Sequence, residues 1–349
     1  MNDLTNNFLE NYITEDKTVF KFIHEDESET AIKITKSLSN KINPILKTIE
    51  EHHSDRNKYS IFISSSRGCF MKCKFCHLTL KNAKHVKLLQ DQVLDNLKQA
   101  IEFVYNERPE ISQKYVKLSW MGMGDALNKP EMVEYVTFNL LDWIFEKKYA
   151  LGLDGVDLST VFPRIKNHNW INIFQNMNEK LKQYKINPVY QMDNVEYTNN
   201  QYQGRNPFRL FYSIESVNQN TRDYIVPNAE LVNNVVPLLQ KYEDNGKYTL
   251  IFHHLIIENL NDGEKELEDL ADWMNNNFPN NELRILRYNF CNKSSYKESE
   301  KFYNQIKFLS DKLKFIKVQI SPGSEVQAAC GQFIVKQYVD GQKLNANKN

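Results

Sequence analysis

The chain has 349 residues, 41% of them hydrophobic, and its 44 basic side chains are balanced by 44 acidic ones. Such a composition can supply a substantial core and excludes a disordered chain. Zero net charge gives no global electrostatic attraction to nucleic acid, so any nucleic-acid surface must be local. No apolar run approaches a membrane span, and the start MNDLTNNFLENY lacks the basic and apolar regions of a signal peptide. We therefore expect a cytoplasmic protein with no membrane association.

The first 57 residues differ from the rest and are predicted to form an amino-terminal extension, with a β-hairpin within TVFKFIHEDESETAIKI at 18–34. From residue 58 onward, strand and helix patterns alternate, which predicts a parallel sheet that is open or closed into a barrel. The predicted strands are 58–66, 115–122, 155–160, 209–214, 248–257, 283–289 and 315–320. The predicted helices include 130–147, 229–243, 263–277 and 297–313, and another carried by Val86, Leu89, Val93, Leu97, Ile101 and Val104.

Residues 58–335 are expected to form one domain, followed by a flexible tail at 336–349. The stretch 164–208 is too long for an ordinary connection between a helix and a strand. It is therefore interpreted as a helix plus an insertion. The sequence contains no internal repeat.

The sequence GCFMKCKFCH at 68–77 holds three of the five cysteines, Cys69, Cys73 and Cys76. An odd number of cysteines with one tight cluster is unlike a disulfide framework and favours metal ligands. Zinc needs four ligands, and the fourth would be His77 or a remote residue. CKFCH also matches the c-type haem attachment pattern, which leaves Cys69 unexplained. A four-iron cluster normally takes four cysteines, but three would leave one iron open for a reacting ligand such as S-adenosylmethionine.

The region that contains these cysteines is strongly basic. Six Lys or Arg side chains and two histidines, with no acid, lie between residues 67 and 90; the cations are Arg67, Lys72, Lys74, Lys81, Lys84 and Lys87. They are interpreted as a phosphate-binding surface, as balance for an anionic cofactor, or as a solvated face.

The spacing CxxxCxΦC, with Phe75 as the aromatic residue, resembles that of the radical S-adenosylmethionine enzymes. Further motifs extend the resemblance to the RlmN/Cfr family of RNA adenine methyltransferases over residues 58–335. In chain order they are GMGDALN (122–128), LST (158–160), Arg222 with Pro227-Asn228, ND (261–262), LRYN (286–289) and AACGQF (328–333). The AACGQ block is specific to this family. The resemblance implies a partial (β/α)6-type barrel that binds a four-iron four-sulfur (4Fe-4S) cluster and S-adenosylmethionine.

The resemblance also implies roles for single residues. Cys69, Cys73 and Cys76 would hold the cluster. Cys330 would carry a methyl group from S-adenosylmethionine to carbon 2 or carbon 8 of an adenine in rRNA or tRNA. The contacts to S-adenosylmethionine would come from Gly124, Asp125, Ser159, Ser213, Ile214, Glu215 and Asn289. A reducing partner such as flavodoxin or ferredoxin is implied as well.

The chain departs from the family at several positions. Phe62 stands where both known family activities use a second cysteine, which helps to release the methylated base. Glu215 stands where the family has His, and Gln319 and Pro322 replace arginines. Cys291 is the remaining thiol that could substitute for the second cysteine, or it is an uninvolved loop residue. Two other functions therefore stay open: radical chemistry on a different substrate, and RNA binding by a non-catalytic relative.

Overall fold

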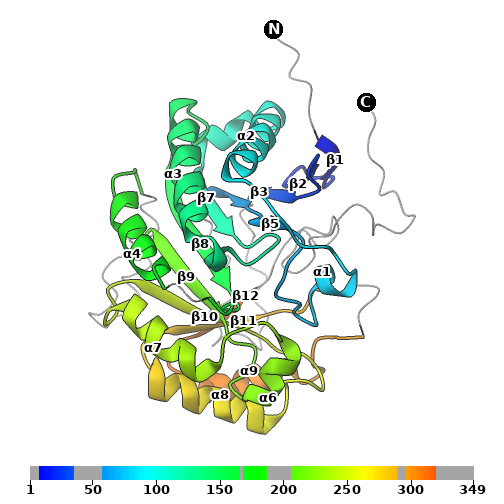
Figure 1. Ribbon diagram of the computed structural model, residues 1–349, viewed down its shortest axis with the longest axis vertical. Coiled ribbons are helices and arrows are strands. Elements are labelled where there is room, and N and C mark those ends of the chain that lie inside the picture. The colour runs from blue at the N-terminus through cyan, green and yellow to red at the C-terminus, as the bar shows by residue number, and fades with distance from the viewer. Residues whose placement is uncertain (1–7, 35–56, 166–167, 187–205, 290–294, 320–349) are drawn as a thin grey trace.

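The computed structural model describes residues 8–34, 57–165, 168–186, 206–289 and 295–319. Its centre is one sheet of ten strands in the order β1-β2-β3-β4-β7-β8-β9-β10-β11-β12 (Figure 1). The strands are β1 Phe8–Ile13, β2 Val19–His24, β3 Glu29–Ile34, β4 Lys58–Phe62, β7 Tyr115–Trp120, β8 Gly152–Thr160, β9 Phe208–Ser213, β10 Thr249–Leu255, β11 Glu282–Leu286 and β12 Ile316–Gln319. Seven of them, from β4 to β12, pair in parallel, so the predicted parallel sheet is confirmed.

The parallel strands follow one another across the sheet in chain order, with a helix between most neighbours. These helices are α2 Gln90–Glu107, α3 Pro130–Glu146, α4 Trp170–Leu181, α6 Gln219–Ile225, α7 Val232–Glu243, α8 Glu264–Asn277 and α9 Phe302–Lys312. Figure 1 shows α2, α3 and α4 side by side along the strands, and each contacts the next. In the described residues no pairing joins β12 back to β4, and seven parallel strands stand where a six-stranded barrel was expected.

The amino-terminal strands continue this sheet. β2 and β3 form the predicted hairpin, and β3 pairs antiparallel with β4, so the hairpin extends the edge of the parallel region. β1, which the sequence did not indicate, adds the outermost strand. Within the described residues, every helix is too short or too polar to cross a membrane.

Successive side chains along each strand point to opposite faces of the sheet, so the two faces differ in composition. In β7, Val116 and Leu118 are fully buried in the main core, while the intervening Lys117 and Ser119 line a cavity on the opposite face. The helices cover the apolar face through stripes of the same kind. In α2 the stripe comprises Val93, Leu94, Leu97, Ala100, Ile101 and Val104, all buried.

The predicted start of α2 was wrong. The helix begins at Gln90, and Leu89 before it is 75% exposed. Val86 belongs instead to the two-residue strand β6 Val86–Lys87, which pairs with β5 Ser66–Arg67. The helical spacing of Val86 and Leu89 therefore arises by chance, because Val86 belongs to a separate two-stranded sheet that precedes the helix.

Candidate active site

One cavity of about 250 Å³ is lined by residues of all seven parallel strands. The strands supply Phe62 of β4, Ser119 of β7, Ser159 of β8, Ser213 of β9, Leu255 of β10, Leu286 of β11 and Gln319 of β12, among others. A single cavity in contact with every parallel strand means that the sheet curves around it. The carboxyl ends of parallel strands are the usual position of chemistry in such folds.

The cysteine loop follows β4 and β5 and contributes Cys69, Cys73 and Cys76 to this cavity. It begins at Gly68, whose φ of +63° and close approach to the carbonyl oxygen of Lys84 leave no room for a Cβ atom. The Cys76 N–H donates to the Cys73 carbonyl oxygen over 3.1 Å, which closes a turn between the second and third cysteines. The Met71 N–H lies 3.5 Å from the Cys69 Sγ. The local sequence therefore directs all three sulfurs to one place.

Residues of a distant segment hold this loop in position. The Asn228 side chain donates to the Phe70 carbonyl oxygen over 2.6 Å, and the Lys74 N–H donates to the Ile225 carbonyl oxygen over 2.9 Å. Arg222 is fully buried and donates to the Val161 carbonyl oxygen over 2.7 Å and to the Ile214 carbonyl oxygen. Arg222 thus joins the ends of β8 and β9. Two of the sequence motifs, Arg222 and Asn228, act here as supports for the cavity.

Cys69, Cys73 and Cys76 are half-buried at the cavity wall, and the pKa values of two of them are raised. Burial raises the pKa of Cys69 to about 12, and the neighbouring Cys76 adds to the effect. The pKa of Cys73 is raised well above its ordinary value, by burial first and then by Cys69 and Cys76. Metal binding would therefore displace protons from these sulfurs.

The donor set can be compared with metal sites of different kinds. Across the described part of the chain, no three His, Cys, Asp or Glu side chains are arranged around a single ion. His77 is buried, its Nε2 has no hydrogen-bond partner among the described residues, and it is not among the residues that line the cavity. In an iron–sulfur cluster each cysteine binds a different iron. Three separate sulfurs facing one cavity fit that requirement.

The GMGD segment packs tightly against the serines that follow β4. A Cβ at Gly124 would lie 2.3 Å from the Ser66 Oγ, and a Cβ at Gly122 would lie 2.6 Å from the Ser64 Oγ. Asp125 comes next and accepts three hydrogen bonds, from the Leu127 N–H, the Thr160 hydroxyl and the Val161 N–H, at 2.9 to 3.1 Å. Burial raises the pKa of Asp125 to about 6, although these bonds favour the ionised form. Asp125 therefore joins the turn after β7 to the end of β8 and still lines the cavity.

The structure brings most of the other expected cofactor contacts to the same cavity. Ser159 and Ser213 end neighbouring strands with their hydroxyl oxygens 3.4 Å apart, and Asn289 lies beyond β11. Ile214 is different, because its side chain is buried in the main core and is not among the lining residues.

Glu215 lines the cavity where the family has a histidine. Its backbone is in the left-handed region with φ of +50°, and the Asn261 side chain donates to its carbonyl oxygen over 2.6 Å. Its Oε2 accepts from the Leu255 N–H over 3.2 Å. Burial raises the pKa of Glu215 to about 7, although this hydrogen bond and Arg222 favour the ionised form. Asn261, from the ND motif, thus holds the residue that departs from the family pattern.

Phe62 also faces the cavity, so the position of the family's second cysteine borders the site. The ring packs against the same small apolar cluster as Cys69 and Cys76, and the Lys33 ammonium lies 4.4 Å from its centroid. Three positions that the sequence singled out, Cys291, Pro322 and Cys330, lie outside the described residues.

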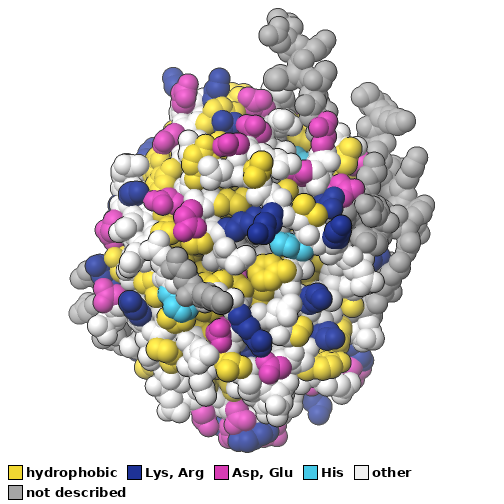
Figure 2. Space-filling model, viewed as in Figure 1, with side chains coloured by type: hydrophobic (Ala, Val, Ile, Leu, Met, Phe, Trp, Pro, Cys, Tyr) yellow, Lys and Arg dark blue, Asp and Glu magenta, His cyan; other side chains and the backbone are white. Residues whose placement is uncertain are grey.

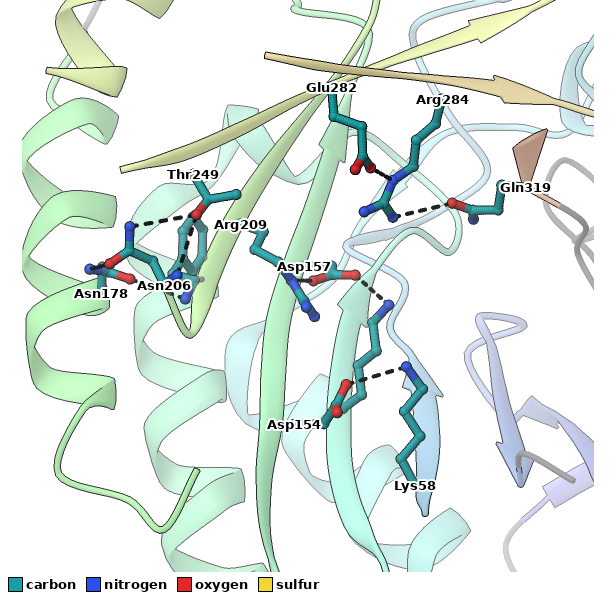
Figure 3. A network of polar contacts seen from close by, with 12 residues as sticks. Lys58, Asp154, Asp157, Asn178, Asn206, Arg209, Thr249, Glu282, Arg284 and Gln319 are labelled. Carbon is teal, nitrogen blue, oxygen red and sulfur yellow. Dashed lines mark hydrogen bonds and ion pairs between the residues drawn. The ribbon is translucent and has the colours of Figure 1, made fainter. Parts of the chain in front are cut away.

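A charged network deeper in the cavity was not anticipated from the sequence (Figure 3). Asp157 of β8 pairs with both Arg209 and Lys117, and Glu282 pairs with Arg284. Charged residues that alternate with apolar ones in a strand usually indicate a solvent-exposed face. The sequence did offer one indication of this network. Seven consecutive strands that form a curved parallel sheet would surround the polar side chains on their inner face.

Consecutive parallel strands surround the cavity, and the loop after the first of them carries three cysteines. This is the arrangement expected from the resemblance to radical S-adenosylmethionine enzymes. No protein-family model matches the chain. A radical SAM methyltransferase from Sphaerobacter thermophilus has a similar fold, with a TM-score of 0.62 and 16% identity over 93% of this chain and 80% of that one.

The sequence relatives are more specific. A probable dual-specificity RNA methyltransferase RlmN from Prochlorococcus marinus is 25% identical over 297 residues, 82% of this chain and 70% of that protein. The dual-specificity RNA methyltransferase RlmN from Wolinella succinogenes is 23% identical over 279 residues, 79% of this chain and 66% of that protein. The chain is thus similar to proteins named RlmN at 23–25% identity.

Proposed function

We propose that this protein is a radical S-adenosylmethionine methyltransferase that methylates carbon 2 or carbon 8 of an adenine in RNA, by way of a methyl group carried on Cys330. The observation that carries the proposal is the gathering of Cys69, Cys73 and Cys76 at one cavity that every parallel strand lines. Relatives named as RNA methyltransferases, and the match of AACGQF at 328–333, support the choice of reaction and substrate.

In this proposal the three thiolates hold a 4Fe-4S cluster, which would supply the electron that cleaves S-adenosylmethionine to a radical. The chain's own groups bind and orient. The Ser159 and Ser213 hydroxyls and the Asn289 amide offer hydrogen bonds to the polar parts of the cofactor from the carboxyl ends of β8, β9 and β11. The half-buried thiols lie in a cavity lined mainly by apolar surface, which limits the access of water to reactive species.

An adenine within paired or structured RNA would have to leave its stack to reach this cavity. The basic segment around α1 His77–Leu80 offers a surface for the flanking phosphates, because Lys72, Lys74, Lys84 and Lys87 are exposed there. Lys and Arg side chains gather on the face around α1, where few acids lie (Figure 2).

The test uses anaerobically purified protein and RNA from cells with and without it. Nucleoside mass spectrometry should find a methyladenosine that depends on the protein, and Cys330 should carry a methyl group in the isolated chain. Cys330→Ala should retain iron but yield no methyladenosine, whereas Cys69→Ala should lose both. Stoichiometric zinc, or haem that survives denaturation, would contradict the proposal.

Phe62 favours a second candidate, a radical enzyme that acts on another substrate without methyl transfer to adenine. A phenyl ring at the cavity wall can neither remove a proton nor form the disulfide that the family's second cysteine provides. Production of 5′-deoxyadenosine with an unmodified Cys330 thiol would select this alternative. If neither deoxyadenosine nor methyladenosine forms in reduced, cluster-loaded protein, a non-catalytic RNA-binding role remains.

A further inference from the structure

The deep part of the cavity is lined by cations that share their acidic partners. Asp157 pairs with Lys117 of β7 and with Arg209 of β9. Glu282 pairs with Arg284 of its own strand and, over 2.9 Å, with Lys317 of β12. Within the described residues, Asp157 and Glu282 each pair with two cations. Figure 3 shows Asp157 with Arg209 and Glu282 with Arg284. Of these cations, Lys117 and Arg284 line the cavity.

Burial makes this arrangement costly unless a further negative charge is present. Burial alone would raise the pKa of Asp157, but Arg209 and Lys117 lower it, so the carboxylate is ionised and already shared. Burial also lowers the pKa of Lys117 despite the attraction of Asp157. A buried cation needs a partner to offset its lost hydration. Lys117 and Arg284 each share their carboxylate with a second cation, so an anion in the cavity would offset the positive charge that the shared carboxylates leave unbalanced.

Neutral donors stand beside the two cations. His253 is 3% exposed and lines the cavity, and its Nε2 has no hydrogen-bond partner among the described residues. The Phe211 ring lies 4.6 Å from the His253 ring and 5.1 Å from the guanidinium carbon of Arg284, which fixes both groups. Gln319 accepts from Arg284 through its Oε1 over 3.4 Å, so its amide N–H groups remain as donors.

We propose that Lys117, Arg284, His253 and Gln319 form a binding site for an oxyanion group, a phosphate or a carboxylate, of a small molecule that enters the cavity. The guanidinium suits the planar geometry of either group, and the ammonium adds a point charge. The cysteine thiols line the same cavity, so the rest of the bound molecule shares its space with them. The site does not depend on the proposed methyl transfer, because none of its residues is expected to hold the cluster or S-adenosylmethionine.

The experiment is isothermal titration of the full-length protein, without S-adenosylmethionine, with inorganic phosphate and separately with acetate at constant ionic strength. At least one anion should bind. Arg284→Gln should weaken that binding about tenfold or more, since a charge-assisted contact is lost. Lys312→Met is the matched control, because Lys312 pairs with Glu268 over 3.3 Å and does not line the cavity. This variant should bind as the wild type does.

Gln319→Glu keeps the test decisive if Arg284→Gln fails to fold. The new carboxylate would lie beside Arg284 as an internal anion and should abolish binding while preserving the fold. Binding of phosphate alone assigns the site to a phosphate group, and binding of acetate assigns it to a carboxylate. The proposal is overturned if the wild type binds neither anion, or if Gln319→Glu binds phosphate and acetate as tightly as the wild type.

Discussion

The two faces of the parallel sheet differ in the side chains that they bury, although both faces are formed by the same strands. On the helix-covered face, Leu158 of β8 and Phe252 of β10 are fully buried in an apolar core. One residue along, Asp157 and His253 are as deeply buried but face the cavity. A chain selected only to fold would fill that cavity with apolar side chains, because buried charges stabilise less than well-packed hydrophobic groups. The polar face is therefore the functional one.

The largest effect expected from this comparison is on the apolar face. Leu158→Ala should lower the free energy of unfolding by about 2–5 kcal/mol, since it leaves a cavity in a fully packed core. Denaturant unfolding followed by circular dichroism measures this change. Leu151→Ala is the control, because Leu151 is 38% exposed and should change stability little. Equal losses for the two variants would contradict the assignment of faces.

The two faces can also be compared through the pH dependence of stability, because the adjacent residues His253 and His254 of β10 lie on opposite faces of the sheet. Burial lowers the pKa of His254 to about 3, and neither of its nitrogens has a partner among the described residues. Below its ordinary pKa near 6.5, an unfolded chain takes up a proton at this residue and the folded chain does not. The stability contributed by the neutral ring is therefore present above pH 6.5 and is lost as the pH falls, by about 1.4 kcal/mol per pH unit.

His254→Gln should remove that part of the slope between pH 6 and 4. The measurement is the midpoint of urea unfolding at several pH values. His253→Gln should also reduce the acid sensitivity, since the pKa of His253 is lowered to about 3 as well, by burial and then by Arg284. The two variants should differ in anion binding, which only His253→Gln impairs. An unchanged slope in His254→Gln would show that its burial is smaller than the structure indicates.

The sequence predicted the parts of the molecule that have a local signal. All seven parallel strands were located within a few residues, because each alternates or concentrates apolar residues over a length typical of a strand. The spacing of Cys69, Cys73 and Cys76 predicted the loop that lines the cavity. The edge strand β1 was missed, because its pairing with β2 contains a register shift and it is only partly buried.

The interior of the cavity could not be predicted in the same way. Lys117 and Arg284 look like solvent-facing positions in their own strands, and only the curvature of the whole sheet places them inside. The left-handed backbone at Glu215 likewise depends on support from Asn261, which lies 46 residues along the chain. Long-range arrangements of this kind leave no trace in local periodicity.

A smaller effect is expected where the cysteine loop is supported. Asn228→Asp keeps the size of the side chain but removes the donor to the Phe70 carbonyl oxygen, and should cost about 1–3 kcal/mol. Iron retained after gel filtration should fall with it, because the loop loses an anchor. Asn234→Asp is the control, since Asn234 is exposed and, among the described residues, its amide bonds only Glu230. Full iron retention in Asn228→Asp would show that the loop holds its shape without this bond.

The smallest change in stability is expected at Ser159, on the cavity face directly beside Leu158. Its hydroxyl contacts only the Ser213 hydroxyl, at 3.4 Å among the described residues, so Ser159→Ala should change the free energy of unfolding by less than about 0.5 kcal/mol. If Ser159 binds the cofactor, the same variant should bind S-adenosylmethionine about tenfold more weakly, since it loses one hydrogen bond to a ligand. Equilibrium dialysis with labelled cofactor measures the affinity, and Thr137→Ser serves as a control in the buried core away from the cavity. The two neighbouring substitutions should thus change different properties. Leu158→Ala should lower the stability of the fold, and Ser159→Ala should lower the affinity for S-adenosylmethionine. A Ser159→Ala variant that binds the cofactor normally would remove this residue from the site and leave Ser213 and Asn289 as the polar groups to test.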